Sequence, residues 1–498
     1  MGSAEGLRWH SGRAHGGMKV MEPYCPGNDL RWNIESNELD TDSLLSLLSR
    51  GADIQGRLSG IDLETRLRTV EEMGRIWSQR WESGELEDMA DRLAASSGYS
   101  RALIDMEMTF TREVLNGENM RKSLEASLQG GAASLQDFVA IGEGEYVRSH
   151  ATGPVLIISS GNSIVPPLIP TITSLVTGNL TILKPSRVNY EAVTEALKGW
   201  EAAAEKSGAP ELKQALVLGY LAADSPGMDQ LLQRGRLGAV NFWGGDPARR
   251  SVASKLASNP HLPRLFINGP LTGFAIVDGD AGEEAAAGLA LNMVMYDQQL
   301  CSSPTQAAFI GSRPEAESFC RLTAQHLDRI GAESEMGISD DGAFLLQCGR
   351  RYVQFAGAKV FQSNDQKNMW TISLSEGLSD LDEAASSYAP LAFHNRRRFL
   401  EMVRVDSAED ALALVADLPM NPAFRGADRV QSVGLAVSAA NRERLLAGLP
   451  ATGAFRIMPV DDMFMRSPLE PYDGMQMAEI FTHRVYMRDR SIRPEVLK

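Results

Sequence analysis

The sequence predicts an α/β fold with two alternating strand–helix regions. Between residues 153 and 265, short apolar strands alternate with helices across short connections, and residues 266–455 continue this alternation. Strands that alternate with helices pair in parallel beneath helices on both faces, and nucleotides bind at the carboxyl ends of such strands. With 498 residues, 43% of them hydrophobic, the chain is long enough for about three domain-sized units.

The first 35 residues are expected to form a flexible extension. Met1–Gly17 is rich in glycine, serine, histidine and arginine, which is typical of a disordered segment or of an upstream extension. Both Met18 and Met21 remain candidates for the natural start. No signal peptide is predicted.

Residues 36–135 are predicted to be a mainly helical part of the cofactor domain. Apolar side chains three and four residues apart indicate an amphipathic helix that contains Leu63, Leu67, Val70, Met73, Trp77 and Trp81. Two further helices are predicted at residues 85–96 and 101–115, with Gly98-Tyr99-Ser100 as the turn between them.

The first alternating region contains four predicted strand–helix pairs. The strands are predicted at residues 155–159, 180–183, 215–218 and 239–242, and the helices at residues 166–177, 189–205, 228–233 and 247–256. Residues 153–183 contain no charged side chain, but prolines and glycines interrupt them. These breaks exclude a membrane-spanning helix.

The second region leads into a C-terminal segment, residues 456–498. Strands are predicted at residues 274–277, 306–310 and 433–437, and helices at residues 283–300, 315–330, 408–418 and 439–447. Alternation in Ile480–Arg488 indicates an edge strand that can pair with residues 146–152, in a β-arm predicted at 136–152. Such an arm would join subunits into a homo-oligomer, although a hairpin within one domain explains the pattern equally well.

The composition excludes several classes of function. A net charge of −15 argues against a nucleic-acid-binding surface. The four cysteines have no metal-ligand spacing and the seven histidines form no cluster, so no metal site is predicted. So few cysteines fit a reducing cytosol, and we expect a cytoplasmic protein.

One cysteine stands at a predicted break in structure. In the segment Tyr296-Asp297-Gln298-Gln299-Leu300-Cys301-Ser302-Ser303-Pro304, Cys301 lies between a helix and a Ser/Pro turn and has polar neighbours. A reactive thiol needs partial exposure and nearby donors, which this setting offers. The alternative is a small buried residue, since free cysteine is among the most buried residue types.

Three turns follow strands of the first region. Lys184, before Pro185 and Ser186, can reach a ribose hydroxyl or a phosphate. The turn Trp243-Gly244-Gly245-Asp246 precedes a helix whose N-terminus favours anions, and Asn162 can offer its amide to an oxyanion. Each has an ordinary alternative: a solvated lysine, an N-cap at Asp246, or an asparagine that satisfies its turn.

The order and spacing of these motifs resemble those of the aldehyde dehydrogenase superfamily, and within it the bacterial LuxC-type fatty acyl-CoA reductases. The resemblance covers about residues 40–490. The motifs that carry it are Gly98-Tyr99-Ser100, Lys184-Pro185-Ser186, Trp243-Gly244-Gly245-Asp246, Gln298–Pro304, Arg456-Ile457-Met458-Pro459-Val460 and Tyr472-Asp473-Gly474. It implies a Rossmann-like cofactor domain, a second α/β catalytic domain that carries Cys301, and an active site between them.

The resemblance also implies a role for each motif. Cys301 would be the nucleophile, and the Asn162 side chain and the Cys301 backbone N–H would form the oxyanion hole. Lys184 and Ser186 would hold the adenosine ribose. The turn at Trp243, Gly244 and Gly245 would lie under the pyrophosphate.

Two departures from the superfamily pattern change the expected chemistry. Hydrolytic members carry a Glu-Leu-Gly-Gly segment whose glutamate activates water, but this chain has Ile267-Asn268-Gly269-Pro270-Leu271. Asn268 cannot act as a general base near pH 7, so an acyl-cysteine would survive to be reduced or passed to a thiol. Around residues 393–397 there is no glutamate like that of the Glu-Ile-Phe-Gly-Pro segment, so the nicotinamide-ribose anchor stays unassigned.

Arg187 bears on the choice of cofactor. NAD-preferring relatives often have glutamate after Lys-Pro-Ser, which would repel a 2′-phosphate, whereas arginine can pair with one. We therefore expect NADPH to be preferred over NADH. The alternative is a solvent-facing arginine without a ligand.

These implications lead to NADPH-dependent reduction of an acyl thioester, such as a fatty acyl-CoA or an acyl carrier, to an aldehyde. Cys301 would hold the acyl group and CoA would leave. The alternatives are CoA-acylating aldehyde oxidation, a cysteine acyltransferase without redox activity, and a non-catalytic subunit. An acyl-protein synthetase or transferase is the expected partner. Chain length, acyl donor and oligomeric state stay open.

Overall fold

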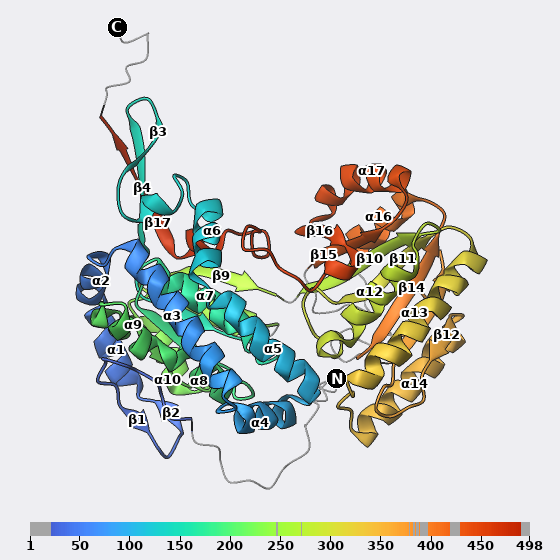
Figure 1. The fold of residues 1–498 in the computed structure, drawn as a ribbon, viewed down its shortest axis with the longest axis horizontal. Helices are drawn as coiled ribbons and strands as arrows, with labels where there is room; N and C mark the ends of the chain where they lie inside the picture. Colours follow the sequence, from blue (N-terminus) through green and yellow to red (C-terminus); the bar gives the residue numbers. More distant parts are fainter. Residues whose placement is uncertain are drawn as a thin grey trace.

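The computed structural model places the two alternating regions in separate lobes, each built around its own sheet, with a three-stranded arm projecting from one of them (Figure 1). It describes residues 21–245, 248–269, 271–377, 379–381, 384, 388, 397–418 and 429–489. The predicted α/β fold is confirmed. Residues 1–20, Asp246, Pro247, Pro270 and residues 393–396 of the predictions lie outside the described residues.

The N-terminal part is mainly helical, as predicted, and packs on the first lobe. Its elements are β1 (Trp32–Asn33), β2 (Glu38–Leu39), α1 (Thr41–Ser49), α2 (Gly51–Ser59), α3 (Leu63–Glu82), α4 (Glu87–Ser97), α5 (Arg101–Val114) and α6 (Gly117–Ser127). The apolar face predicted for α3 is buried at Leu67, Val70, Met73 and Trp77. The Trp77 indole N–H donates to the Met108 carbonyl of α5 at 2.8 Å, which joins the two helices.

The first sheet has five parallel strands in the order β7-β6-β5-β8-β9. They are β5 (Val155–Ile158), β6 (Thr181–Lys184), β7 (Leu216–Leu218), β8 (Ala239–Trp243) and β9 (Arg264–Asn268), covered by α7 (Val165–Val176), α8 (Tyr190–Leu197), α9 (Gly199–Lys206), α10 (Pro226–Arg234) and α11 (Ala248–Leu256). The chain moves outward from β5 to β7 and then returns to β8 on the other side of β5. This order creates a switch point at the carboxyl ends of β5 and β8, where ligands bind in such sheets.

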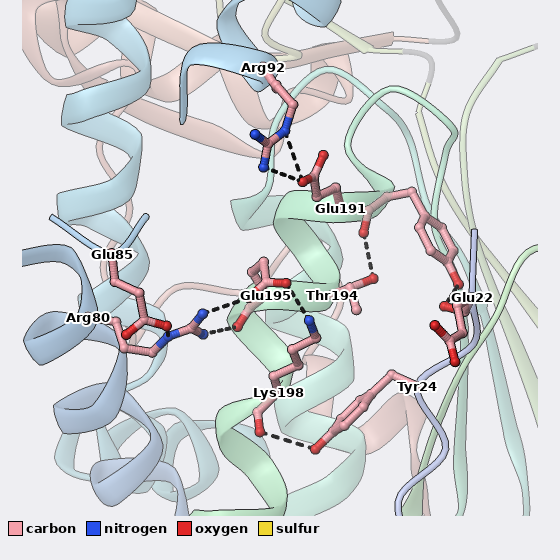
Figure 2. A network of polar contacts seen from close by, with 10 residues as sticks. Glu22, Tyr24, Arg80, Glu85, Arg92, Glu191, Thr194, Glu195 and Lys198 are labelled. Atoms are coloured by element: carbon pink, nitrogen blue, oxygen red, sulfur yellow. Dashed lines mark hydrogen bonds and ion pairs between the residues drawn. The ribbon is translucent and has the colours of Figure 1, made fainter. Parts of the chain in front are cut away.

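The single helix predicted at residues 189–205 is instead two helices, α8 and α9, that meet at Lys198. Glu195 of α8 binds Arg80 of α3 at 2.7 Å and Lys198 at 2.5 Å (Figure 2). The Tyr24 hydroxyl donates to the Lys198 carbonyl at 3.2 Å. These contacts tie the N-terminal segment and α3 to the break between the helices.

The second sheet has seven strands in the order β12-β13-β14-β11-β10-β15-β16, and only β12 runs antiparallel to its neighbour. The strands are β10 (Leu271–Asp278), β11 (Pro304–Ile310), β12 (Lys359–Gln362), β13 (Thr371–Glu376), β14 (Phe399–Val405), β15 (Arg429–Ala436) and β16 (Arg456–Pro459). The helices are α12 (Glu283–Val294), α13 (Arg313–Glu333), α14 (Asp340–Ala356), α16 (Ala408–Asp417) and α17 (Ala439–Gly448), with the short α18 (Met477–Ile480) further along. The sequence did not predict β12, β13, β14, β16 or α14.

The predicted pairing of the strand near Ile480–Arg488 with residues 146–152 is confirmed. Strand β17 (Thr482–Arg488) runs antiparallel to β4 (Glu145–Ala151), with Thr482 opposite Ala151, and β3 (Val139–Gly142) pairs on the other side of β4. This sheet forms the arm above the first lobe (Figure 1). Among the described residues, no helix has both the length and the apolar character needed to cross a bilayer.

Candidate active site

A cavity of about 740 Å³ lies where the carboxyl end of the first sheet faces the amino end of the second. Of the predicted site residues, it brings together Cys301, Asn162, Trp243 and Gly244. The remaining four, Lys184, Ser186, Arg187 and Gly245, do not line it. The predicted nucleophile and oxyanion donor therefore share one chamber, next to the first glycine of the predicted pyrophosphate turn.

Cys301 follows a left-handed stretch of backbone, so the prediction of a helix up to Leu300 was wrong. The helix α12 ends at Val294, and Tyr296, Asp297 and Gln298 have φ of +50°, +48° and +66°. Three consecutive non-glycine residues in this region store strain, which persists only where surrounding contacts hold it.

Buried polar contacts hold this strained stretch. The Arg398 Nε donates to the Asp297 carboxylate at 2.8 Å, and both side chains are almost fully buried. Gln298 accepts from the Phe399 N–H at 2.6 Å and donates to the Pro304 carbonyl at 2.7 Å. The start of β14 therefore fixes the residues that lead into Cys301.

The backbone after Cys301 packs directly on β10. A Cβ at Gly273 would lie 2.1 Å from the Ser302 carbonyl oxygen, so only glycine fits there. The Gly273 N–H donates to the Ser303 carbonyl at 2.9 Å. This close approach of Gly273 to the Ser302–Ser303 backbone sets the position of the neighbouring Cys301 thiol in the cavity.

Among the residues that the structure describes, the Cys301 thiol has one direct polar partner, Gln431 at the start of β15, whose Nε2 lies 3.0 Å from Sγ. Burial raises the pKa of the Cys301 thiol, and the negative charge of Asp473 raises it further, whereas Arg466 and the Gln431 hydrogen bond act in the opposite direction. These surroundings disfavour the thiolate overall, and Arg466 and Gln431 offset this in part.

Asn162 lies in the turn after β5 and is oriented from both sides. Its Nδ2 donates to the Gln299 carbonyl of the cysteine loop at 3.3 Å, and its Oδ1 accepts from the Ser160 hydroxyl at 2.9 Å. The amide N–H thus points toward the loop that carries Cys301, the direction that an oxyanion donor needs. The hydrogen bond from Asn162 to the Gln299 carbonyl is long, and a substrate oxygen can replace this carbonyl as the acceptor.

Asn268, at the end of β9, has both amide groups engaged. Its Oδ1 accepts from the Asn241 Nδ2 at 2.8 Å, and its Nδ2 donates to Asp473 at 2.8 Å. Asn241 in turn accepts from the Trp243 indole N–H. An amide lacks the basicity to activate water, and these hydrogen bonds fix the orientation of this one.

The predicted ribose site lies at the carboxyl end of β6. Lys184 is buried, and its Nζ lies 5.2 Å from the centre of the Tyr220 ring, with no hydrogen-bond acceptor among the described residues. Burial lowers the pKa of Lys184 to about 8. A Cβ at Gly161 would lie 2.5 Å from the Ser186 hydroxyl, so the turns after β5 and β6 touch. A buried ammonium without an acceptor fits a ligand with hydroxyl or phosphate oxygens.

The two glycines after β8 differ in their contacts. The Gly244 N–H donates to the Asn268 carbonyl at 3.2 Å, which extends the β8–β9 pairing. Gly245 accepts from the Arg249 N–H at the start of α11 at 3.2 Å. Gly245 therefore stands at a helix N-terminus, where backbone amides favour an anion.

Much of the cavity lining is apolar. It includes Phe110, Val114, Met120, Val165, Ile169, Leu300, Phe464 and Met477. Within the described ranges, no group of three or more His, Cys, Asp or Glu side chains could hold a metal ion. The chamber thus combines a thiol, amide donors and an apolar wall.

Three residues of the site were missed by the sequence reasoning: Gln431, Asp473 and Glu107. Gln431 lies next to a predicted apolar strand, and Asp473 lies in a motif that the resemblance had marked. Glu107 is fully buried on α5 and accepts from the Ile164 N–H at 2.6 Å and from the Ser163 hydroxyl, next to Asn162. A carboxylate on the buried face of a predicted helix was the available signal.

The sequence is similar to a known family and to known proteins. A model of the family described as acyl-CoA reductase (LuxC) matches residues 58–483. A long-chain acyl-protein thioester reductase of Vibrio harveyi is 25% identical over 306 residues, 60% of this chain and 61% of that protein. A second, long-chain acyl-protein thioester reductase 2 of Photobacterium leiognathi, is 23% identical over 341 residues, 68% of either chain. The match thus spans less than two thirds of the Vibrio protein.

Solved structures of aldehyde dehydrogenases share the fold. A succinic semialdehyde dehydrogenase from Streptococcus pyogenes, in complex with NADP+, superposes with a TM-score of 0.67 at 14% identity, over 90% of this chain and 95% of that one. A NAD-dependent benzaldehyde dehydrogenase from Corynebacterium glutamicum gives 0.64 at 14% identity, over 95% and 99%. These values show that the chain has the aldehyde dehydrogenase fold.

Proposed function

The chain belongs to the acyl-CoA reductase (LuxC) family, and from this membership and the surroundings of Cys301 we propose that it reduces an acyl thioester to an aldehyde with NADPH. Cys301 would carry the acyl group between acylation and reduction. The observation that carries the proposal is Asn268. Cys301 and Asn268 line the same cavity, and Asn268, with both amide groups hydrogen-bonded, stands where the hydrolytic relatives would have the base that activates water.

In the proposed reaction, the Cys301 thiolate attacks the carbonyl carbon of the acyl thioester. Asn162 and the Cys301 backbone N–H would stabilise the developing oxyanion. The carbon–sulfur bond to the donor breaks, and the departing thiolate, such as that of CoA, is protonated. NADPH, when bound, supplies a hydride to the acyl carbon. The bond to Cys301 then breaks, which releases the aldehyde and the free thiol, with one proton consumed overall.

The apolar wall of the cavity supports a fatty acyl substrate. Phe110, Val114, Met120 and Ile169 offer no hydrogen-bonding groups to a substrate, so an alkyl chain is the natural occupant. The names of the Vibrio and Photobacterium relatives point to long acyl chains carried by a protein. We propose that the acyl donor is a CoA thioester or a protein-bound thioester, delivered by an acyl-protein synthetase or transferase.

The cofactor residues support a nicotinamide dinucleotide. Lys184 and Ser186 would hold the adenosine ribose, and Arg187 beside them would pair with a 2′-phosphate. Trp243, Gly244 and Gly245 would line the pyrophosphate site at the start of α11. This arrangement supports NADPH as the preferred donor.

Acyl transfer to the enzyme tests the proposal directly. Purified protein is incubated with radiolabelled acyl-CoA, with and without NADPH, and both protein-bound label and aldehyde are measured. We expect a stable label on Cys301 without NADPH and its discharge as aldehyde when NADPH is added. Cys301→Ser should lose both signals, whereas Cys348→Ser, which removes another partly exposed thiol, should retain them.

The same experiment separates the alternatives. Discharge of the label only by an acceptor thiol or hydroxyl would indicate an acyltransferase, and no label at all would indicate a non-catalytic subunit. Aldehyde formation by Cys301→Ser would refute the acyl-enzyme. Initial rates in both directions at equal saturation separate reduction from CoA-acylating oxidation.

A further inference from the structure

The site contains a second group in contact with the reacting sulfur. Building on the proposed function, we propose that Gln431 is a catalytic residue whose amide N–H stabilises the Cys301 thiolate, and that Asp473 is the positioning residue that orients this amide. Neither role follows from the motifs of the sequence. Both are carried by a continuous hydrogen-bond network that runs from Cys301 through Gln431 and Asp473 to Asn268.

One nitrogen of Gln431 serves two acceptors. Its Nε2 lies 3.0 Å from the Cys301 Sγ and 2.6 Å from the Asp473 Oδ1. Because an amide nitrogen carries two hydrogens, one can point at the sulfur while the other points at the carboxylate. Gln431 is fully buried at the start of β15, which leaves its side chain little freedom to choose other partners.

Asp473 fixes which end of the amide faces the sulfur. Its carboxylate accepts hydrogen bonds but donates none, so a flipped Gln431 would bring the carbonyl Oε1 against a negative charge. The other carboxylate oxygen accepts from the Asn268 Nδ2 at 2.8 Å, and the Arg466 Nη2 lies 3.6 Å from Oδ1. The buried carboxylate is thus held from several sides and in turn holds the amide.

The donors on the other side of Asp473 also point toward it. The Trp243 N–H donates to Asn241, Asn241 donates to Asn268, and Asn268 donates to Asp473. All three hydrogen bonds therefore donate in the same direction, from Trp243 on the predicted cofactor side of the cavity to the Asp473 carboxylate. No amide in it can flip without leaving a buried donor or acceptor unpaired, which is costly.

This arrangement explains how a thiol whose surroundings raise its pKa can react. An N–H donor favours the thiolate both before attack and when the acyl-cysteine bond breaks, because both states place negative charge on the sulfur. The charge of Asp473 opposes the thiolate, and Arg466 offsets that charge. Asp473 thus has two separable effects. Its oxygen orients the Gln431 amide, and its charge opposes the Cys301 thiolate.

The pH dependence of Cys301 alkylation by iodoacetamide tests the proposal without substrate or cofactor. Peptide mass spectrometry follows Cys301 alone, and the readout is the pH midpoint of the alkylation rate. Gln431→Leu should raise this midpoint by about one to two pH units, the usual worth of a hydrogen bond to a charged group. Gln431→Asn, which retains an amide but withdraws it by one methylene, should shift the midpoint in the same direction if the leucine variant does not fold.

Two substitutions at Asp473 separate orientation from charge. Asp473→Asn keeps one acceptor oxygen, which can serve Gln431 while the hydrogen bond from Asn268 is lost, and it removes the charge, so its midpoint should lie below that of the wild type. Asp473→Leu removes both, so its midpoint should lie above that of Asp473→Asn. The acylation rate constant should follow the thiolate fraction in each variant.

Two results would overturn the proposal. A pH midpoint in Gln431→Leu equal to that of the wild type would show that the amide does not stabilise the thiolate. Equal midpoints in the two Asp473 variants would show that Asp473 does not orient it. If the wild type makes no aldehyde but the midpoints shift as described, the proposed function fails while this inference stands.

Discussion

At the residue scale, the predicted ribose site gathers two cations around one tyrosine. The Arg187 Nε donates to the Tyr220 hydroxyl at 2.9 Å, and its guanidinium and the Lys184 ammonium lie 5.0 Å and 5.2 Å from the ring centre. Glu38 of β2 lies close enough to favour the charged form of Lys184, but its carboxylate accepts from the Ala222 N–H at 2.9 Å. The net positive charge of Lys184, Arg187 and Glu38 together favours a phosphate over an uncharged hydroxyl as the ligand.

Replacing Arg187 tests this balance. In Arg187→Ala, we expect the ratio of kcat/KM for NADPH to that for NADH to fall about tenfold or more, because a charge-assisted bond to the 2′-phosphate is lost. Initial-rate kinetics with both cofactors measure the ratio. Arg236→Ala removes another exposed arginine of the same lobe and should leave it unchanged. An unchanged ratio in Arg187→Ala would mean that the arginine faces solvent.

At the element scale, Glu107 joins α5 to the start of α7 and to the cysteine loop. Its carboxyl accepts from the Ile164 N–H at 2.6 Å and from the Ser163 hydroxyl, the two residues after Asn162. Burial raises its pKa to about 7, despite opposing hydrogen bonds that include one from Tyr296. The protonated form therefore fits the fold better than the ionised form, at the joint that positions the oxyanion donor.

This burial predicts a pH-dependent stability. Because the folded-state pKa lies above the unfolded value of 4.5, the contribution of Glu107 is fully present below pH 4.5 and is lost as the pH rises to about 7. The loss is on the order of 3 kcal/mol. Urea unfolding of the wild type and Glu107→Gln from pH 4.5 to 8 measures it, with the wild type losing stability relative to the variant. Parallel profiles would contradict the raised pKa.

Sequence patterns predicted some helices and strands accurately and others wrongly. The period of α3 and the apolar runs of β5 and β6 predicted those elements closely, because burial on one or both faces determines the pattern. The helix after Glu283 was predicted too long because apolar residues continue past Val294. The contacts that stop it, such as the bond between Asp297 and Arg398, join residues 101 positions apart. No local pattern can reveal them.

At the scale of the whole molecule, the site lies between two sheets that the chain links directly. β9 ends the first sheet and β10 starts in the second, with Gly269 at φ +85° between them. The sequence motifs identified Cys301 and Asn162 because each follows the end of a predicted helix or strand. Gln431 reaches the sulfur, and Asp473 reaches Gln431, because the fold brings β15 and the segment after β16 to Cys301. Their roles depend on tertiary structure, which spacing does not show.

The arm is the other feature of the whole molecule, and it leads to a prediction of self-association. In β17, the large apolar side chains Val485 and Met487 are exposed, as is Ile141 of β3. Within the described part of the chain, the outer edges of β17 and β3 pair with no further strand. An exposed apolar strand edge is a template for pairing with another chain.

We therefore expect the chain to form a homo-oligomer through this arm. Light scattering coupled to size exclusion should give a multiple of the chain mass for the wild type, and a single chain for Val485→Lys combined with Met487→Lys. Lysines on a strand edge oppose pairing because the charges must be desolvated and repel their copies. Leu446→Lys on α17, also an exposed apolar residue made basic, should keep the wild-type mass. A monomeric wild type, or an unchanged mass in the double variant, would assign the arm to the fold of a single chain.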